Sequence, residues 1–303
     1  MNTITVRFWG GLGNVLFQIA ATVAYANMFN RQIVFDSYES LPGLGDYSAS
    51  SVGLNNQEYT NSLKEYSEED IAKNIPFPNT DPHVKLIGFY QDYLFFDSLK
   101  DKIFNIIGLS KIQTDILPIV QGPSFIENRL FQSQTPTISL HIRRGDYENI
   151  SCYFLLIDQY YYKLALLNII NRISTNINVL VFYEKKAYNS ANKIIDSLKN
   201  DVDLLGYSIQ FYHFNELLDA QKTPVTDIEE MVIMSQCDHH IIANSTYSWW
   251  AAYINYNPNK VVCYPNQFYN HQLYYLSIKG MQVNGWTSVP SWNPNKYKCA
   301  CNC

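Results

Sequence analysis

The N-terminal segment combines two hydrophobic periods joined by glycines. Apolar and polar residues alternate from Ile4 to Phe8, which is the period of a half-buried strand. After the turn Gly10–Asn14 (GGLGN), apolar residues follow helical spacing from Val15 to about Phe29, and Ile33 to Phe35 predicts another strand. The chain is therefore expected to open with a strand, a helix and a second strand.

The rest of the chain repeats this alternation of strands and helices. Strands are predicted at Val84 to Tyr90, Thr137 to Ile142, Asn178 to Phe182, Ser208 to Tyr212, His240 to Ala243 and Val261 to Tyr264. Helices are predicted at Asp92 to about Gly108, near Gln159 to Ile173, near Ser190 to Lys199, from Asp227, and at Ser248 to Asn255. Residues 37 to 82 are polar and turn-rich and predict loops with at most short helices. Strands separated by such helices predict an α/β fold with parallel sheets covered on both faces.

A break near residue 135 divides the chain. The turn-forming stretches around Gly122 and Pro136 are typical of a linker, and a strong strand follows them. We therefore predict an N-terminal α/β domain over residues 1–135, a C-terminal Rossmann-like domain over 136–290, and a cysteine-containing tail over 291–303. Ligands of open parallel sheets bind beyond the carboxyl ends of the strands, so the residues just after each strand are the candidates for chemistry.

Composition excludes some function classes. A hydrophobic content of 47% is ample for a buried core, and a formal net charge of −5 with a pI near 5.7 argues against a nucleic-acid partner. The aromatic content of 15%, with 24 tyrosines and 5 tryptophans, suits packing and carbohydrate stacking alike. The chain shows neither a signal-peptide pattern nor the roughly 18 consecutive apolar residues of a membrane span. A cytoplasmic, reducing location is expected, and the oligomeric state is left open.

The six cysteines fall into two groups. Cys152, Cys237 and Cys263 lie singly among apolar residues and are expected to be small buried hydrophobes. The other three belong to the C-terminal CACNC, whose spacing is not that of a zinc ribbon. We interpret that segment as a frayed tail.

Two adjacent arginines follow the predicted strand Thr137 to Ile142, at its carboxyl end. They belong to the segment His141–Tyr147 (HIRRGDY), and only six arginines occur in the whole chain. Guanidinium groups match phosphate oxygens in a two-pronged geometry, so Arg143 and Arg144 indicate recognition of a dense anion. A structural ion pair with Asp146 at the turn is the alternative.

A second polar segment follows another buried strand. Cys237–Trp250 (CDHHIIANSTYSWW) continues from the strand into hydroxyl residues that open a helix. Helix N-termini offer free amides and the positive end of the helix dipole, so Ser245 and Thr246 are placed to hold a diphosphate. Simple N-capping by these residues is the alternative.

The glycine turn Gly10–Asn14 lets the backbone approach a ligand closely. A dinucleotide-binding turn is one interpretation, because Asp36 ends the next strand, where an acidic residue would bind a ribose. The spacing argues against it, because Leu16 stands where the third glycine of the G-x-G-x-x-G pattern belongs.

Together these three segments resemble the inverting α-1,2-fucosyltransferases of glycosyltransferase family 11, and the resemblance extends over most of the chain. Gly11–Gln18 is similar to the family's opening G-L-G-N-Q-L-F-Q, with Val15 in place of the usual Gln. His141–Tyr147 resembles its H-x-R-R-G-D-Y, and Cys237–Trp250 resembles its C-x-H-x-I-I-A-N-S-[ST]-[FY]-S-W-W. A weaker similarity is that of Gly88–Gln91 (GFYQ) to its G-Y-F-Q.

The resemblance implies a GT-B-like pair of Rossmann-like domains facing a cleft, with GDP-fucose held mainly by the C-terminal domain and the acceptor on the N-terminal side. It implies inverting transfer of L-fucose from GDP-β-L-fucose to the 2-hydroxyl of a galactose-containing glycan, with no metal or other cofactor. Arg143 is expected to stabilise the leaving diphosphate, and Asp146 to act as general base or to orient an arginine. Donor-binding residues are expected at Gly13, Asn14, His141, Arg143, Arg144, Glu230, Asn244, Ser245 and Thr246.

Two carboxylate motifs allow more than one interpretation. Asp201–Asp203 (DVD) has the pattern of the D-x-D metal motif of other glycosyltransferases, but its place between a polar helix and a strand is typical of solvated residues. Thr226–Glu229 fits a capping box, and Glu230 beside it stands where the family often has an acid that contacts guanine or ribose.

Two other functions remain as alternatives. One is a fucosyltransferase of another linkage, α-1,6 or protein O-fucosylation, and the other is a sugar- or nucleotide-binding protein without activity. Incubation with GDP-fucose and a panel of acceptors would discriminate them.

Overall fold

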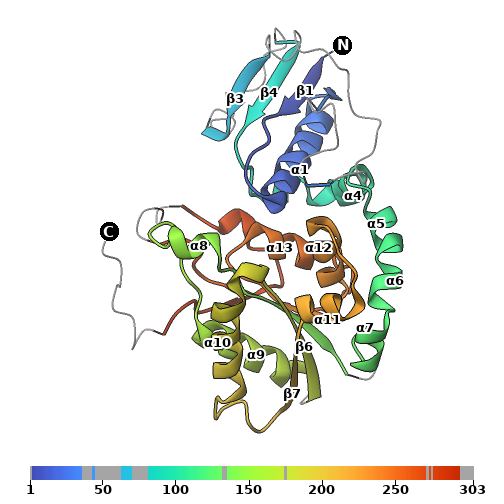
Figure 1. The fold of residues 1–303 in the computed structure, drawn as a ribbon. Coiled ribbons are helices and arrows are strands. Elements are labelled where there is room, and N and C mark those ends of the chain that lie inside the picture. Colours follow the sequence, from blue (N-terminus) through green and yellow to red (C-terminus); the bar gives the residue numbers. More distant parts are fainter. Residues whose placement is uncertain are drawn as a thin grey trace. The chain divides into compact units, whose positions relative to one another are not determined.

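The protein divides into two compact units, Met1–Asp115 with Lys279–Met281, and Ile116–Ile278 with Gln282–Cys303. The computed structural model describes residues 2–35, 43–44, 63–69, 81–131, 135–173, 176–270, 273 and 276–293. Each unit carries its own parallel sheet with helices packed on it (Figure 1). The predicted α/β class is confirmed.

The first unit is built on a four-stranded parallel sheet in the order β2-β1-β4-β3. The strands are β1 (Thr3–Val6), β2 (Gln32–Ile33), β3 (Lys64–Ser67) and β4 (His83–Ile87). Helix α1 (Leu12–Met28) connects β1 to β2 as predicted, and it is buried on nearly all sides, which explains its apolar sequence. β3 lies in the segment predicted as loops, so that prediction is wrong there. Its sequence KEYS has no apolar alternation because β3 is an exposed edge strand.

The predicted helix from Asp92 to about Gly108 is broken in the structure. The break lies at Phe96 and Leu99, whose φ angles of −129° and −110° are not helical, and Gly108, with a φ of 71°, ends the last helical part near the predicted end. The segment forms η2 (Tyr93–Phe95), η3 (Asp97–Leu99), α4 (Lys100–Ile106) and α5 (Leu109–Asp115).

The second unit carries a six-stranded parallel sheet in the order β10-β9-β8-β5-β6-β7. Its strands are β5 (Thr137–His141), β6 (Asn176–Phe182), β7 (Ser208–His213), β8 (His239–Ile241), β9 (Val262–Pro265) and β10 (Thr287–Val289). Counted from β7, the order is third, second, first, fourth, fifth, sixth, which is the Rossmann order. The order reverses between β5 and β8, so their carboxyl ends form the topological switch point at which such sheets bind ligands.

Helices cover both faces of this second sheet. The longer ones are α9 (Gln159–Ile173), α10 (Tyr188–Lys199), α11 (Phe214–Gln221), α12 (Asp227–Ser235) and α13 (Thr246–Ile254). Along β6, Val179 and Val181 belong to the core that α9 and α10 close. Phe182 points to the other face and packs on Phe214 of α11, with ring centroids 4.6 Å apart. Alternate side chains of one strand therefore serve opposite layers.

The boundary between the units lies after Asp115, whereas the sequence suggested residue 135. Packing explains the difference. Phe125 lies against Phe214 of α11, with ring centroids 6.3 Å apart, and the Gln221 side chain accepts a hydrogen bond from the backbone nitrogen of Ser124 at 3.1 Å. The shorter helices are α6 (Leu117–Val120), α7 (Pro123–Glu127), α8 (Asp146–Asn149), η4 (Lys185–Ala187) and η5 (Lys279–Met281).

The cysteines divide differently from the prediction. Cys237 and Cys263 are buried free thiols, as predicted. Cys152 is half-buried and disulfide-bonded, so its prediction as a buried hydrophobe is wrong, because it lies in the turn-rich loop after α8. The CACNC segment lies outside the described residues.

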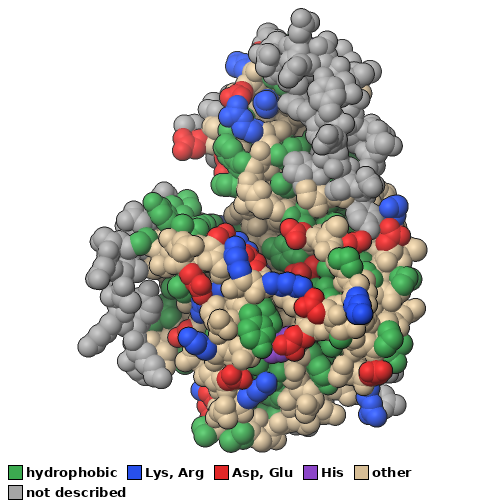
Figure 2. Space-filling model, in the orientation of Figure 1, with side chains coloured by type: hydrophobic (Ala, Val, Ile, Leu, Met, Phe, Trp, Pro, Cys, Tyr) green, Lys and Arg blue, Asp and Glu red, His purple; other side chains and the backbone are tan. Residues whose placement is uncertain are grey.

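The surface that Figure 2 shows mixes acidic and basic side chains over the coloured atoms. Within the part of the chain that the structure describes, no single helix has the length and apolar character needed to cross a membrane. One bent pair, Asp97–Ile106 with Leu109–Val120, meets that test by length and composition alone.

Candidate functional site

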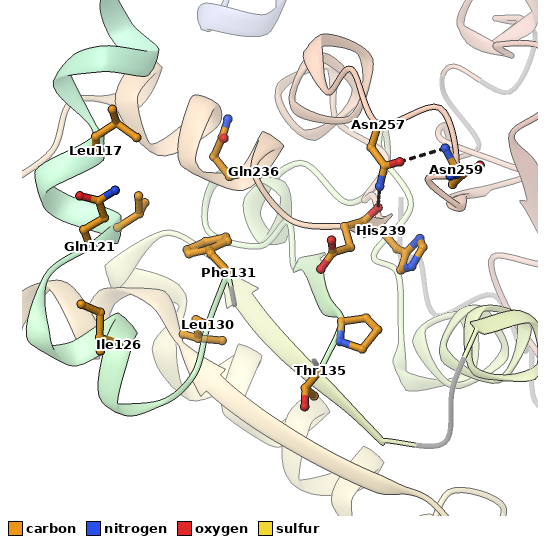
Figure 3. A pocket seen from close by; sticks show the side chains of 13 residues that line it. Leu117, Gln121, Ile126, Leu130, Phe131, Thr135, Gln236, His239, Asn257 and Asn259 are labelled. Atoms are coloured by element: carbon orange, nitrogen blue, oxygen red, sulfur yellow. Dashed lines mark hydrogen bonds between the residues drawn. The ribbon is translucent and has the colours of Figure 1, made fainter. Parts of the chain in front are cut away.

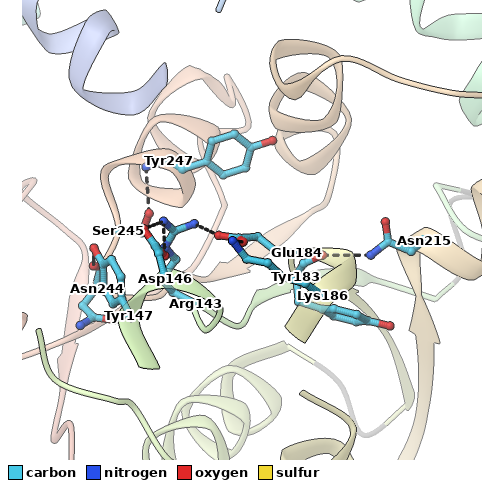
Figure 4. A network of polar contacts seen from close by, with 10 residues as sticks. All are labelled: Arg143, Asp146, Tyr147, Tyr183, Glu184, Lys186, Asn215, Asn244, Ser245 and Tyr247. Carbon is cyan, nitrogen blue, oxygen red and sulfur yellow. Dashed lines mark hydrogen bonds and ion pairs between the residues drawn. The ribbon is translucent and has the colours of Figure 1, made fainter. Parts of the chain in front are cut away.

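The switch point of the second unit gathers most of the predicted site residues. Arg143 and Asp146 follow β5, Ser245 follows β8, and Glu184 follows β6, the strand on the other side of β5. Figure 4 shows these side chains converging at one edge of the sheet, next to Tyr247 of α13. The residues that follow three neighbouring strands therefore form one polar site.

Arg143 is held between two carboxylates. Its Nη1 donates to Oε1 of Glu184 at 2.5 Å, and its Nη2 lies 2.7 Å from Oδ1 of Asp146. The guanidinium carbon lies 4.8 Å from the ring centroid of Tyr147, a cation–π distance. The Arg143 side chain is 23% exposed, so it is fixed in direction and still open to a ligand. The alternative pair with Asp146 does form, and Glu184 is an additional member of the network.

The turn between Arg143 and Asp146 requires glycine. Gly145 has a φ of 72°, and a Cβ there would lie 2.6 Å from Oε2 of Glu184 and 2.7 Å from Cε of Lys186. The Lys186 ammonium binds the same Glu184 oxygen at 2.7 Å. The glycine of the R-R-G-D-Y segment therefore makes room for the carboxylate that holds Arg143.

Arg144 is half-buried like Arg143, and His141 is buried. Nη2 of Arg144 donates to the backbone oxygen of Ile157 at 2.6 Å, which ties the end of β5 to a neighbouring loop. His141 is 5% exposed, and burial together with the nearby Arg143 charge lowers its pKa to about 3. The imidazole of His141 is therefore neutral at physiological pH.

Four predicted site residues carry a buried polar atom with no hydrogen-bond partner within the described part of the chain. These atoms are Nδ1 of His141, Nε of Arg143, Nη1 of Arg144 and Oδ1 of Asn244. Buried polar atoms are bonded in most proteins, so a group of them at one edge of a sheet indicates a place for a polar ligand. The residues belong to the ends of β5 and β8, which form the switch point. The guanidinium nitrogens suit a phosphate oxygen, whereas Oδ1 of Asn244 can accept a hydrogen bond from a hydroxyl or N–H group of the same ligand.

The start of α13 is a capped helix N-terminus. Ser245 is the N-cap, and its hydroxyl accepts a hydrogen bond from the backbone nitrogen of Tyr247 at 3.3 Å. In this structure Ser245 therefore acts as an N-cap, which was the alternative to diphosphate binding. Asn244 is fixed by its amide nitrogen, which donates to two backbone oxygens at 2.8 and 2.9 Å. Thr246 is the half-buried first residue of the helix.

Glu230 lies in the first turn of α12, beside the capping box that Thr226 and Glu229 form as predicted. Its carboxyl group lies beside the hydroxyl of Tyr247 on α13, which donates to the backbone oxygen of Asp227 at 2.7 Å. Burial, with the negative charge of Asp227 nearby, raises the pKa of Glu230 to about 7. The group therefore titrates near neutral pH, where it can either donate or accept a hydrogen bond.

Replacing Glu230 by glutamine should change how stability depends on pH. Folding raises its pKa from 4.5 to about 7, so the folded state binds more protons and stability falls as the pH rises through this window. This group should cost the wild type up to about 3 kcal/mol between those limits, and Glu230→Gln should abolish that loss. Thermal melts at about pH 5 and pH 8 measure it, with the exposed Glu148→Gln as control. Parallel pH profiles for wild type and Glu230→Gln would contradict the raised pKa.

Asn14 and Gly13 belong to the first unit. Asn14 lies at the start of α1, and its Oδ1 accepts a hydrogen bond from Nε2 of Gln91 at 3.0 Å. Gly13 is buried beside it. Gly10 has a φ of 81°, and a Cβ there would lie 2.5 Å from Nδ2 of Asn14, so the turn needs glycine to pass this amide. Asp36, considered above for ribose binding, lies outside the described residues.

The D-x-D sequence is engaged in ion pairs. The ammonium of Lys163 lies 3.2 Å from the carboxylate of Asp201 and 3.0 Å from that of Asp203. Lysine therefore occupies the position that a cation would take between the two carboxylates. Within the described ranges, no cluster of three or more His, Cys, Asp and Glu side chains has a metal-binding arrangement.

A pocket of about 690 Å³ lies at the opposite, amino edge of the second sheet. Figure 3 shows it between Leu117 of α6, Phe131, and the start of β8 at His239. Pro136 before β5 and Asn257 after α13 complete the border. Since it adjoins the beginnings of β5 and β8, this pocket is separate from the site at their carboxyl ends.

Sequence reasoning missed Glu184 and Lys186. In the sheet, His141 pairs with Phe182, so Glu184 stands two residues beyond β6 as Arg143 does beyond β5. A charged run directly after a strongly apolar strand was the available signal. Only the strand order makes it part of the Arg143 site.

The chain has two α/β units, each with a parallel sheet, and the second has a Rossmann switch point with an arginine and a helix N-terminus beside it. This is the architecture of a GT-B-like glycosyltransferase. The chain belongs to glycosyl transferase family 11, whose family model matches residues 1–288. The resemblance found in the sequence motifs and the predicted GT-B-like fold are both confirmed.

Two relatives of this chain are named as glycosyltransferases as well. An α-1,2-colitosyltransferase from Escherichia coli is 24% identical over 85% of this chain and 89% of its own length. The O-antigen biosynthesis glycosyltransferase WbnK, also from Escherichia coli, is 28% identical over 61% of this chain and 55% of its own length. Among solved structures, Arabidopsis thaliana FUT1 in complex with GDP has a similar fold, with a TM-score of 0.50 and 13% identity over 86% of this chain and 70% of that one.

Proposed function

We propose that this protein transfers L-fucose, with inversion, from GDP-β-L-fucose to the 2-hydroxyl of a galactosyl acceptor. Membership of glycosyl transferase family 11 and the α-1,2 linkage in the name of one relative support this activity. The observation that carries the proposal is Arg143, which two carboxylates hold at the switch point while its side chain stays 23% exposed. A fixed cation at this place suits a leaving diphosphate.

In this reaction, O2 of galactose attacks C1 of fucose while the bond from C1 to the β-phosphate oxygen breaks on the opposite face. Negative charge grows on the diphosphate, and Arg143 together with the N-terminus of α13 stabilises it. The proton of O2 passes to a base or to solvent. Asp146 is the candidate base, but both its oxygens lie within 2.8 Å of Nη2 of Arg143, which favours its orienting role. An oxocarbenium-like transition state lowers the need for a strong base.

The remaining predicted residues take binding roles in this proposal. Ser245 and Thr246 stand at the start of α13, where the positive end of the helix dipole favours the diphosphate, and the Ser245 hydroxyl can donate to a phosphate oxygen. Glu230, with its pKa near 7, is suited to the N–H groups of guanine or to a ribose hydroxyl. Residues proposed to complete the donor site are Gly13, Asn14, His141, Arg144 and Asn244.

The test is an acceptor panel with GDP-fucose. Lactose and methyl β-D-galactopyranoside should be fucosylated, and NMR of the product should place the new linkage at O2 of galactose. Transfer to a 6-hydroxyl or to a protein hydroxyl would show that the acceptor group is not the 2-hydroxyl of galactose. Tight GDP-fucose binding without any transfer would favour the non-enzymatic alternative.

A second donor is favoured by the similarity to an α-1,2-colitosyltransferase over most of both chains. Colitose is L-fucose without its 3-hydroxyl, so a site for one sugar has the shape for the other. Competition between GDP-fucose and GDP-colitose for one acceptor measures the ratio of their kcat/KM values. A ratio in favour of colitose would assign this chain a colitosyl donor with the same linkage chemistry.

Activity should be independent of a divalent cation. The proposed site uses Arg143 and a helix N-terminus for the phosphates, and the D-x-D carboxylates are already paired with Lys163. Fucosyl transfer should therefore persist in EDTA, and Asp201→Ala should keep wild-type kcat. Loss of activity on chelation, restored by Mn²⁺, together with an inactive Asp201→Ala variant, would overturn this proposal.

A further inference from the structure

Two exposed aromatic side chains lie together at the carboxyl edge of the first sheet. Trp9 follows β1 and Phe89 follows β4, and these strands are parallel neighbours in which Val6 pairs with Leu86. Trp9 is 38% exposed and Phe89 is 40% exposed, and their ring centroids lie 5.6 Å apart at an interplanar angle of 54°. The pair therefore forms one aromatic surface at the edge where parallel sheets bind ligands.

A buried amide holds the two aromatic segments side by side. Gln18 of α1 is fully buried, its Oε1 accepts a hydrogen bond from the backbone nitrogen of Trp9 at 3.3 Å, and its Nε2 donates to the backbone oxygen of Gly88 at 3.1 Å. Both loops are thus anchored to one side chain. The exposure of Trp9 and Phe89 is a fixed feature of this edge.

The backbone around Phe89 is unusual for so short a loop. Tyr90 has a φ of 53°, a left-handed conformation that is costly for a bulky residue, and its backbone nitrogen donates to the side chain of Glu68. Gly88 has a φ of 158°, and a Cβ there would lie 2.4 Å from Cγ of Glu68. Backbone held in such regions is enriched at ligand-binding sites.

Two amide side chains follow the aromatic residues closely along the chain. Asn14 lies in the first turn of α1, after Trp9, and its Oδ1 accepts a hydrogen bond from Gln91, two residues beyond Phe89. Flat apolar faces beside amide dipoles suit a ligand that has both a hydrocarbon face and hydroxyl groups. A pyranose sugar has this chemistry.

We infer that Trp9 and Phe89 form the platform on which the galactosyl acceptor stacks, an inference that rests on the proposed function. Galactose carries its C4 hydroxyl in the axial position, so its hydrogens at C3, C4 and C5 form an apolar patch on the opposite face. That patch packs on the indole of Trp9, while the hydroxyls at the ring edge reach the amide of Gln91. In glucose the C4 hydroxyl is equatorial, so its ring presents no such continuous patch.

Steady-state kinetics with lactose and GDP-fucose test the platform. Trp9→Ala should raise the KM for lactose at least about tenfold, the scale of a lost aromatic contact, with a change of less than about twofold in the KM for GDP-fucose. Trp9→Phe should recover most of the lactose affinity, since it restores a ring. Tyr256→Ala, which removes a 57% exposed tyrosine of the second unit, serves as the control and should keep both constants.

Binding without donor separates this inference from the proposed function. Lactose and methyl β-D-galactopyranoside should change the tryptophan fluorescence of the wild type but not of Trp9→Phe, and methyl β-D-glucopyranoside should have a weaker effect. If no acceptor is fucosylated but this Trp9-dependent signal appears, the proposed reaction fails and the platform stands. If lactose is fucosylated while Trp9→Ala and Phe89→Ala keep the wild-type KM for lactose, the platform is wrong and the reaction stands.

Discussion

Arg143→Ala should fold normally and lose about 10²- to 10³-fold in kcat, because it removes a preorganised charge from the leaving diphosphate. The fold should persist because Glu184 keeps the ammonium of Lys186 as a partner and Asp146 is half-exposed. Arg143→Lys should recover little. An ammonium cannot bridge Glu184 and Asp146 while presenting a forked donor to phosphate.

Arg144 provides the comparison for this experiment. Its guanidinium holds the backbone oxygen of Ile157, so Arg144→Ala should lower the melting temperature more than it lowers kcat. Arg129→Ala, at an exposed arginine of the same unit, controls for loss of charge alone. If the kcat of folded Arg143→Ala stays within about threefold of wild type, the change is far below the scale of a lost oxyanion donor. The contact with phosphate would then be assigned to Arg144.

Acid should unfold the second unit through its buried histidines. His240 is fully buried, and its ring nitrogens lie 2.7 Å from Oγ of Ser139 and 2.8 Å from Nδ2 of Asn255. The Asn255 amide donates to Nε2, so the ring is neutral, and burial, with the charge of Lys260, lowers the pKa of His240 to about 3. The unfolded state thus binds more protons between pH 6.5 and about 3, and stability falls as the pH falls through that window.

The expected change in stability with pH is larger for His240 than for Glu230, and the two have opposite sign. A shift from 6.5 to about 3 corresponds to about 5 kcal/mol for His240, and His141, with a similarly lowered pKa, adds to it. Since a domain has only about 5–15 kcal/mol of stability, acid unfolding should be complete near the lower limit of the window.

Urea titrations between about pH 7 and pH 4 measure this dependence. His240→Asn should be less stable at neutral pH but should show a shallower loss toward acid, because one titrating group is gone. His83→Gln, in the first unit, should follow the wild-type profile. A His240→Asn profile parallel to that of the wild type would place the acid sensitivity elsewhere.

Local patterns predicted most of the elements of the second unit. A helix was predicted near Gln159 to Ile173, which are the bounds of α9, because its helical period is long. α11 and β10 were missed, since both are short. In the first unit, the apolar spacing after Asp92 is helical, but non-helical backbone at Phe96 and Leu99 divides the segment into η2, η3 and α4.

By itself, the sequence determined the kinds of side chain available for chemistry and their place after strands. Hydrophobic period fixes where a strand ends, so Arg143, Ser245 and Asn14 could be singled out without coordinates. The glycines beside them could be predicted as turns, because positive φ favours glycine whatever the surroundings. These are properties of neighbouring residues along the chain, which local pattern reports directly.

Only the tertiary structure decided which of these residues meet. The strand order brings Glu184 to Arg143 across 41 positions of sequence, and parallel pairing of β1 with β4 sets Phe89 beside Trp9. Burial raises the pKa of Glu230 and lowers that of His141, although neither has an unusual sequence neighbourhood. Such pairings and desolvation depend on contacts between distant segments, and these arise when sheets and helices pack.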